Sequence, residues 1–167
     1  YLVVQDVDSF KKINDTNGHL FGDAVLCSFA DELSNIFPEA LKGRIGGDEF
    51  VFYVEDMDRE QLEERLKHLN RCMSDRYDDD KTGLHISCSL GVAVTDGTVT
   101  DYNLLFQWAD AALYQVKSKG KGTYYLLDVR EGVALPGKSY LDSEENKEDE
   151  IVHKEAQFES AEDLVLF

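Results

Sequence analysis

The chain has 167 residues, of which 43% are hydrophobic, and its formal net charge at pH 7 is −17. This length suits one domain plus an appendage, and no apolar run approaches the ~18 residues that a membrane span needs. The negative charge argues against a nucleic-acid polymer or an anionic membrane as a partner. The three cysteines are irregularly spaced, which favours reduced thiols in a cytoplasmic domain over disulfides or a zinc site.

Apolar periodicity predicts alternating strands and helices along residues 1–127. We expect strands at 1–6, 41–45, 50–55, 84–94 and 124–127, and helices near 9–16, 22–36, 59–73 and 102–117. Pro38 follows the second helix and ends it. Elements in this order predict an α+β fold, in which helices cover a central, mostly antiparallel sheet.

The character of the chain changes at about Asp128. Residues 128–167 hold 12 acidic and 4 basic side chains, a net charge of −8, which leaves −9 on residues 1–127. We therefore expect a domain at 1–127 and an acidic extension or linker at 128–167. The run 142–150 is expected to be a solvated loop, and the apolar residues of 151–167 have the spacing of an amphipathic helix.

The run 44–50 reads R-I-G-G-D-E-F and lies between two expected strands. Glycine lets another molecule approach the backbone closely, and adjacent carboxylates suit Mg²⁺, which often arrives with a phosphate. The run therefore indicates either a nucleotide and metal site or a simple hairpin turn, because short motifs also occur by chance.

Asp6 ends the first expected strand, where a carboxylate either caps the following helix or joins Asp48 around a cation. Asn14 and Asp23 follow in the segment up to residue 23. An amide donates and accepts hydrogen bonds and a carboxylate accepts two, so these side chains can read the edge of guanine. The alternatives are a turn-forming Asn and an Asp near the start of the second helix.

The pattern D-x-D-x-F-K-x-I-N-D-x-x-G-H-x-x-G-D-x-x-L at 6–26, followed by G-G-D-E-F at 46–50, resembles the GGDEF family of bacterial diguanylate cyclases. The resemblance continues in S-L-G-V-A at 89–93, in A-D-A-A-L-Y-Q-V-K at 109–117 and in the pair Gly120-Lys121. It implies a sheet like the palm of nucleotide cyclases and polymerases. It also implies that a dimer condenses two GTP into cyclic di-GMP and two pyrophosphates. The competing reading is a GTP-binding regulatory module without catalysis.

For the metal, the resemblance implies that Asp6, Asp48 and the backbone carbonyl of Val7 hold Mg²⁺ (or Mn²⁺), with Glu49 as a further ligand. Glu49 could instead satisfy a backbone or lysine partner. Asp48 is also implied as the proton acceptor, but a metal-bound carboxylate is a poor base, so the ligand role is favoured. Lys11 matches the lysine that stabilises the transition state; otherwise it is a solvated helix lysine.

For the substrate, the resemblance implies that Asn14 and Asp23 read guanine, which favours GTP over adenine nucleotides. Gly46 and Gly47 would lie against the nucleotide. Lys117 and Lys121 match the positions that hold the terminal phosphates. His19 matches a substrate contact, and it could equally fix the Gly18 turn.

The sequence departs from the family pattern in three places. The family more often has arginine where Lys121 stands, and lysine lacks the bidentate fork, so weaker GTP affinity is expected. The product-inhibition motif R-x-x-D should occupy 37–40, which here reads F-P-E-A. The family's opening helix and D-x-L-T-G-L-x-N-R stretch should precede Tyr1. We therefore expect a piece of a longer protein, which could be membrane-anchored and fused to sensor or other signalling domains, and a fragment of low activity.

Overall fold

A single mixed sheet organises the computed structural model, which describes residues 1–78, 84–130 and 165–166. The strands are β1 (Leu2–Val7), β2 (Leu41–Arg44), β3 (Glu49–Tyr53), β4 (Cys88–Val94), β5 (Tyr124–Asp128) and β6 (Val165–Leu166). The helices are α1 (Phe10–Asn17), α2 (His19–Ile36), α3 (Arg59–Tyr77) and α4 (Tyr102–Ser118). Of the acidic extension or linker expected at 128–167, residues 131–164 and 167, which include the acidic run, lie outside the described residues.

The strand order across the sheet is β5-β4-β1-β3-β2-β6. Every neighbouring pair is antiparallel except β4 and β5, which run parallel. β1 is the central strand, and all six of its residues are buried. The predicted α+β class with a mostly antiparallel sheet is confirmed.

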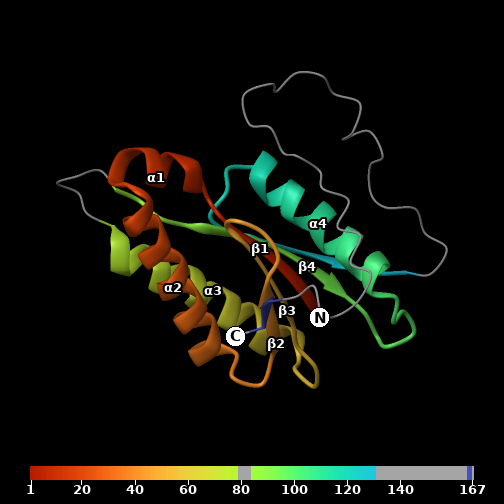
Figure 1. Cartoon of the computed structure of the whole chain (residues 1–167). Helices are drawn as coiled ribbons and strands as arrows, with labels where there is room; N and C mark the ends of the chain where they lie inside the picture. The colour runs from red at the N-terminus through yellow and green to blue at the C-terminus, as the bar shows by residue number, and fades with distance from the viewer. Residues whose placement is uncertain (79–83, 131–164, 167) are drawn as a thin grey trace, which may run out of the picture.

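Helices cover both faces of the sheet, and Figure 1 shows α2 and α3 on one side and α4 on the other. Successive residues of a strand point to opposite faces. Val3 and Val7 accordingly pack with the side chains of α2 and α3, whereas Leu2 and Val4 pack with those of α4. Two hydrophobic cores therefore enclose β1, and its last residues are held in place from both sides.

The core on the α2 side is rich in phenylalanine. The rings of Phe29 and Phe50 lie 4.8 Å apart between centroids, and those of Phe37 and Phe52 lie 5.0 Å apart. Burial of such side chains removes large apolar areas from water and dominates core energetics. These contacts fix β3, which carries Glu49 at its start, against α2.

Several expected boundaries differ from the structure, and the strand expected at 84–94 begins only at Cys88. α2 begins at His19 rather than near 22, directly after Gly18, which has a φ of 86°. α3 continues to Tyr77, beyond the expected end at 73. Residues 165–166, expected in a helix, form β6 against the edge of β2, because an edge strand offers unpaired backbone groups to any extended segment nearby. None of the helices in the described residues is long and apolar enough to cross a bilayer.

Candidate active site

The pairing of β1 with β3 brings the predicted metal ligands to one end of the sheet. Asp6 lies opposite Glu49 in the register, and the Val7 amide donates to the Asp48 carbonyl oxygen over 3.2 Å. Residues more than forty positions apart in the sequence are thus neighbours. The site is built on the strands of the central sheet, which hold side chains more rigidly than loops do.

The turn that carries Asp48 is closed by the side chain of Arg44. Its Nε donates to the Gly46 carbonyl over 3.1 Å, and Nη2 donates to the Gly47 carbonyl over 2.6 Å. Neither of these glycines has a positive φ, so their role is to leave space. A Cβ on Gly46 would lie 2.7 Å from Oε2 of Glu49, and a Cβ on Gly47 would meet no atom of the described residues within 4 Å.

Crowded carboxylates raise one another's pKa at this end of the sheet. Burial raises the pKa of Asp6 to about 6, against the opposing effect of Lys117, with smaller upward effects from Asp48 and Asp8. Burial first, then Glu49, raises the pKa of Asp48. Burial and Asp6 raise the pKa of Glu49. The arrangement concentrates negative charge where a cation would relieve it.

Lys117, on the last turn of α4, supplies one such positive charge. Its Nζ lies 2.8 Å from Oδ2 of Asp6, and both side chains are largely buried. Sequence reasoning assigned Lys117 to the substrate phosphates and did not foresee this ion pair. The pair joins a predicted phosphate ligand to a predicted metal ligand through one charge-assisted contact.

The donor chemistry of the site fits a hard cation. Among the described residues, no three His, Cys, Asp or Glu side chains are grouped closely enough to form a metal cage. Mg²⁺ does not require one, because it keeps several waters and is usually held by one or two carboxylates together with substrate phosphates. Asp6 and Asp48 match that description, and their metal role stays a prediction.

The predicted guanine reader Asn14 lies where α1 packs against α2. Its Oδ1 is buried and has no hydrogen-bond partner among the described residues. A Cβ on Gly22 would lie only 1.9 Å from this oxygen, so the Asn14 amide can occupy its position only because residue 22 has no side chain. A buried acceptor left unpaired is costly, and a ligand donor such as a guanine N–H would satisfy it.

Three other predicted residues lie on the same helices and are exposed. Lys11 is in the first turn of α1, His19 begins α2, and Asp23 lies one turn further along α2. They share the α1 and α2 side of the molecule with Asn14, which leaves their predicted roles open. His19 directly follows the Gly18 turn. This position is compatible both with a substrate contact and with a role in fixing the turn.

Lys121 lies in the connection between α4 and β5 and reaches the corner between β1 and α1. Its Nζ donates to Oγ of Ser9 over 3.4 Å. Its φ is 66°, which is uncommon for any residue except glycine. The two predicted phosphate lysines, 117 and 121, are therefore both beside the end of β1.

Sequence reasoning missed Arg44 and Asp8, to which it gave no role. Arg44 was visible only as the residue before I-G-G, and its two carbonyl contacts could not be read from that spacing. Asp8 is buried and is hydrogen-bonded to Ser87, Ser89 and Gly122. The available signal was its position two residues after Asp6, just beyond the strand that carries Asp6.

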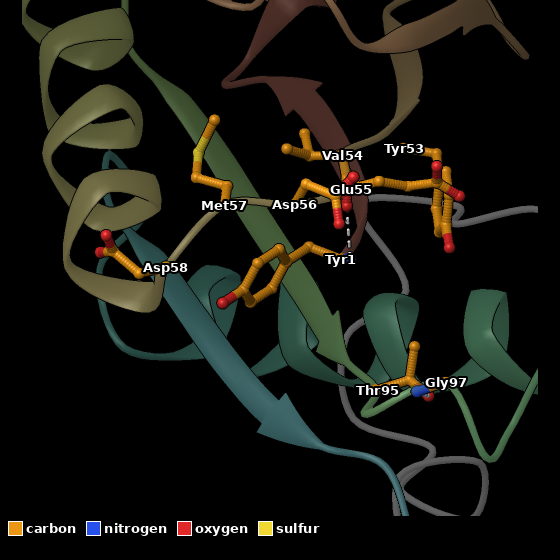
Figure 2. Close-up of a pocket in the computed structure, with 9 residues that line it drawn as sticks. All are labelled: Tyr1, Tyr53, Val54, Glu55, Asp56, Met57, Asp58, Thr95 and Gly97. Carbon is orange, nitrogen blue, oxygen red and sulfur yellow. Dashed lines mark hydrogen bonds between the residues drawn. The ribbon is translucent and has the colours of Figure 1, made fainter.

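A pocket of about 450 Å³ lies at the opposite end of the same strands. Figure 2 shows Tyr1 beside the loop 55–58 and near Thr95 and Gly97. The terminal ammonium group of Tyr1 donates a hydrogen bond to the Val54 carbonyl oxygen. The described residues that line the pocket include three carboxylates and no lysine or arginine. These residues do not supply the positive charge that a nucleoside triphosphate needs, and the pocket is separate from the carboxylate end of β1.

Residues 1–123 match the family described as "Diguanylate cyclase, GGDEF domain". Diguanylate cyclase DgcS of Shewanella oneidensis is 37% identical over 128 residues, which cover 75% of this chain and 41% of DgcS. Cyclic di-GMP phosphodiesterase PdeR of Escherichia coli is 31% identical over 124 residues, which cover 74% of this chain and 19% of PdeR. The chain thus spans less than half the length of either relative.

Among solved structures, the active GGEEF domain of a diguanylate cyclase from Vibrio cholerae superposes with a TM-score of 0.67 at 27% sequence identity. The match covers 78% of this chain and 82% of that one. Fold and sequence therefore agree on one class, the α+β GGDEF domains. The chain belongs to the GGDEF-domain family of diguanylate cyclases.

Proposed function

We propose that the chain is the catalytic domain of a diguanylate cyclase, which condenses two GTP into cyclic di-GMP and two pyrophosphates. The observation that carries the proposal is that strand pairing places Asp6, Asp48 and Glu49 at the same end of the sheet, where Lys117 forms an ion pair with Asp6. A nucleotidyl transfer needs both a place for a divalent cation and fixed positive charge near the phosphates. The carboxylates at this end of the sheet support the first requirement, and Lys117 supports the second.

In the proposed reaction, the ribose 3′-oxygen of one GTP attacks the α-phosphorus of another, and the bond to pyrophosphate breaks. Bound Mg²⁺, held by Asp6, Asp48 and the Val7 carbonyl with Glu49 nearby, would acidify the hydroxyl and neutralise phosphate charge. Asp48 takes up the hydroxyl proton if its carboxylate is free to do so. Lys11 stabilises the charge that builds on the phosphorus oxygens, and Lys117 and Lys121 hold the outgoing phosphates.

Guanine selection falls to the α1 and α2 side of the site. The unpaired Oδ1 of Asn14 accepts from a guanine N–H, and the exposed carboxylate of Asp23 accepts from the adjacent N–H groups. Adenine presents no such pair of donors, so GTP is the expected substrate. Each domain holds one GTP, and two copies must face each other to form both phosphodiester bonds.

The product-inhibition motif is replaced by core residues. Phe37 is fully buried and packs on Phe52, and Ala40 is 8% exposed. Phe37 and Ala40, which stand where the motif has its arginine and aspartate, support the sheet and carry no charged group for a cyclic dinucleotide. We expect no feedback through residues 37–40, and tight product binding that is abolished by changes in this segment would contradict that expectation.

The reaction is tested with the purified chain, Mg²⁺ and GTP, with cyclic di-GMP measured by chromatography. Asp48→Ala and Asp6→Ala should abolish product formation, whereas Asp56→Ala, an exposed carboxylate in the loop after β3, should not. Full activity in either of the first two variants would refute the site assignment.

A non-catalytic GTP-binding module is the second candidate. It is supported by the similarity of the chain to part of PdeR, which is named a phosphodiesterase and not a cyclase. Retention of both Asp48 and Glu49 favours the cyclase. Calorimetry separates the two: GTP binding by the chain without any cyclic di-GMP, at concentrations high enough to pair the domains, would support the module.

A further inference from the structure

Asp8 is a buried carboxylate just beyond β1, and it lies outside every role given above. Its side chain is 7% exposed, and both of its oxygens accept hydrogen bonds. Oδ1 accepts from the Ser89 hydroxyl over 2.6 Å. Oδ2 accepts from the Ser87 hydroxyl over 2.6 Å and from the Gly122 amide over 3.0 Å. A buried carboxylate this fully bonded is held rigidly and orders the groups around it.

The partners of Asp8 come from two segments that are distant from it in the sequence. Ser87 precedes β4, Ser89 lies within it, and Gly122 belongs to the connection between α4 and β5. The Gly122 amide also lies 3.2 Å from the Ser89 hydroxyl, and the Asp8 amide donates to the Ser87 carbonyl over 2.9 Å. Asp8 thus ties the α4–β5 connection to the end of β1.

The residue next to Gly122 is Lys121, one of the two predicted phosphate lysines. Gly120, Lys121 and Gly122 all have positive φ, at 126°, 66° and 66°. Such a conformation at a non-glycine residue persists where surrounding contacts determine it. The contacts here are the Gly122–Asp8 bond, the Lys121 amide on the Val116 carbonyl at 3.1 Å, and Lys121 Nζ on Ser9 Oγ at 3.4 Å.

We propose that Asp8 is a positioning residue for phosphate binding: by anchoring Gly122, it holds Lys121 at the end of β1, where the terminal phosphates of the nucleotide would lie. The proposal rests on the proposed function and deepens it. Asp8 touches neither substrate nor metal and acts through Lys121. Without the anchor, Lys121 keeps its charge but loses its fixed position, and ordering it again reduces the affinity gained on binding.

The test is the loss of affinity for phosphates in Asp8→Asn, a variant of the same size that keeps only one acceptor oxygen. Dissociation constants are measured by calorimetry on the full chain with Mg²⁺, using GMP and a GTP analogue that cannot be cleaved at the α-phosphorus. We expect the constant for the analogue to rise on the order of tenfold and that for GMP to change less than about twofold. GMP lacks the phosphates that Lys121 would contact.

A double-mutant cycle shows whether Asp8 acts through Lys121. In a Lys121→Ala background, Asp8→Asn should change the constant for the analogue less than about twofold, because the two residues act as one unit. Asp31→Asn, an exposed carboxylate on α2, is the matched control and should leave both constants unchanged. Where Asp8→Asn does not fold, Ser87→Ala is used instead, since this variant removes a single hydrogen-bond donor to Asp8. It should weaken binding of the analogue by a smaller factor and leave binding of GMP unchanged.

The outcomes separate this inference from the proposed function. If the wild-type chain binds no GTP analogue, both are overturned. If the wild type binds the analogue but Asp8→Asn weakens the binding of GMP and of the analogue equally, Asp8 is merely structural and only this inference falls. The same holds if the effects of Asp8→Asn and Lys121→Ala on analogue binding are fully additive. A selective and non-additive loss supports it.

Discussion

Lys121 is a single side chain whose chemistry limits how tightly a phosphate can be held. An ammonium group is a point charge, whereas guanidinium binds phosphate through two parallel N–H bonds. The left-handed backbone at 121 is no harder for arginine than for lysine, because both carry the same Cβ. We predict that Lys121→Arg lowers the dissociation constant for GTP about threefold, measured by calorimetry. Lys12→Arg on α1 should have no effect, and unchanged or weaker binding in Lys121→Arg would contradict the phosphate role.

Gln5 is a buried polar residue in the middle of β1 and is 0% exposed. Neither its amide oxygen nor its nitrogen has a hydrogen-bond partner among the described residues, and the neighbouring Cys88 thiol is only a weak hydrogen-bonding group. A buried amide without a partner costs about 1–3 kcal/mol. Replacement by an apolar side chain of similar shape removes that cost.

We therefore predict that Gln5→Met raises the free energy of unfolding by about 1 kcal/mol, as measured by urea denaturation. The matched control is Gln107→Met on the exposed side of α4, which should change it by less than about 0.5 kcal/mol. A less stable Gln5→Met protein would mean that the amide makes a contact the structure does not show.

At the scale of elements, α4 lies on the sheet because β4 has a glycine where the two meet. A Cβ on Gly91 would lie 2.0 Å from the Ala109 carbonyl oxygen and 2.2 Å from the Leu113 amide nitrogen. Both are backbone atoms of α4, so no side chain can move aside to make room. The position of α4 matters for the site because its last turn carries Lys117.

Gly91→Ala should therefore lower the free energy of unfolding by at least about 2 kcal/mol, as overpacked cores do. It should also weaken GTP binding, since Lys117 moves with α4. Gly47→Ala is the comparison for stability, because no atom of the described residues lies within 4 Å of the added Cβ and φ is not positive. It should change the free energy of unfolding by less than about 0.5 kcal/mol. Equal stability of the two variants would show that α4 shifts freely.

Most elements of this fold could be predicted from residue patterns, and their boundaries less well. Apolar spacing located α2, α3 and α4 because one face of each is buried in a core. The start of α2 was placed late, because Gly18 and His19 give no side-chain cap to read. Strand β6 was missed because two residues carry no periodicity, and their pairing depends on an open edge of the sheet.

Some residues of the candidate site could likewise be predicted from the sequence, whereas the contacts between them could not. Asp6, Asp48 and Glu49 could be proposed from the sequence, since the motifs mark them and the strands bring them together. The bonds of Asp8 to Ser87 and to Gly122 join residues 79 and 114 positions apart, and no local pattern signals them. The same holds for the ion pair of Lys117 with Asp6, which depends on how α4 lies across β1.

For the whole molecule, charge and the proposed reaction act against each other. Each copy carries a net charge of −17, and the proposed reaction needs two copies face to face. Like-charged proteins repel over distances set by the Debye length, which shortens from roughly 30 Å at 0.01 M salt to roughly 10 Å at 0.1 M. Screening should therefore favour pairing.

We predict that the association of the chain, measured by sedimentation, strengthens as ionic strength rises from about 0.01 M to about 0.1 M. Specific activity at a fixed low concentration should rise with it, and should also rise steeply with protein concentration at either salt. Salt also weakens the contacts of lysines with phosphates. The GTP dissociation constant is therefore measured at both ionic strengths, and activity is compared at saturating GTP so that weaker GTP binding does not change it. Association that weakens with salt would instead indicate that the pairing faces carry opposite charges, with the acidic surplus of each copy turned outward.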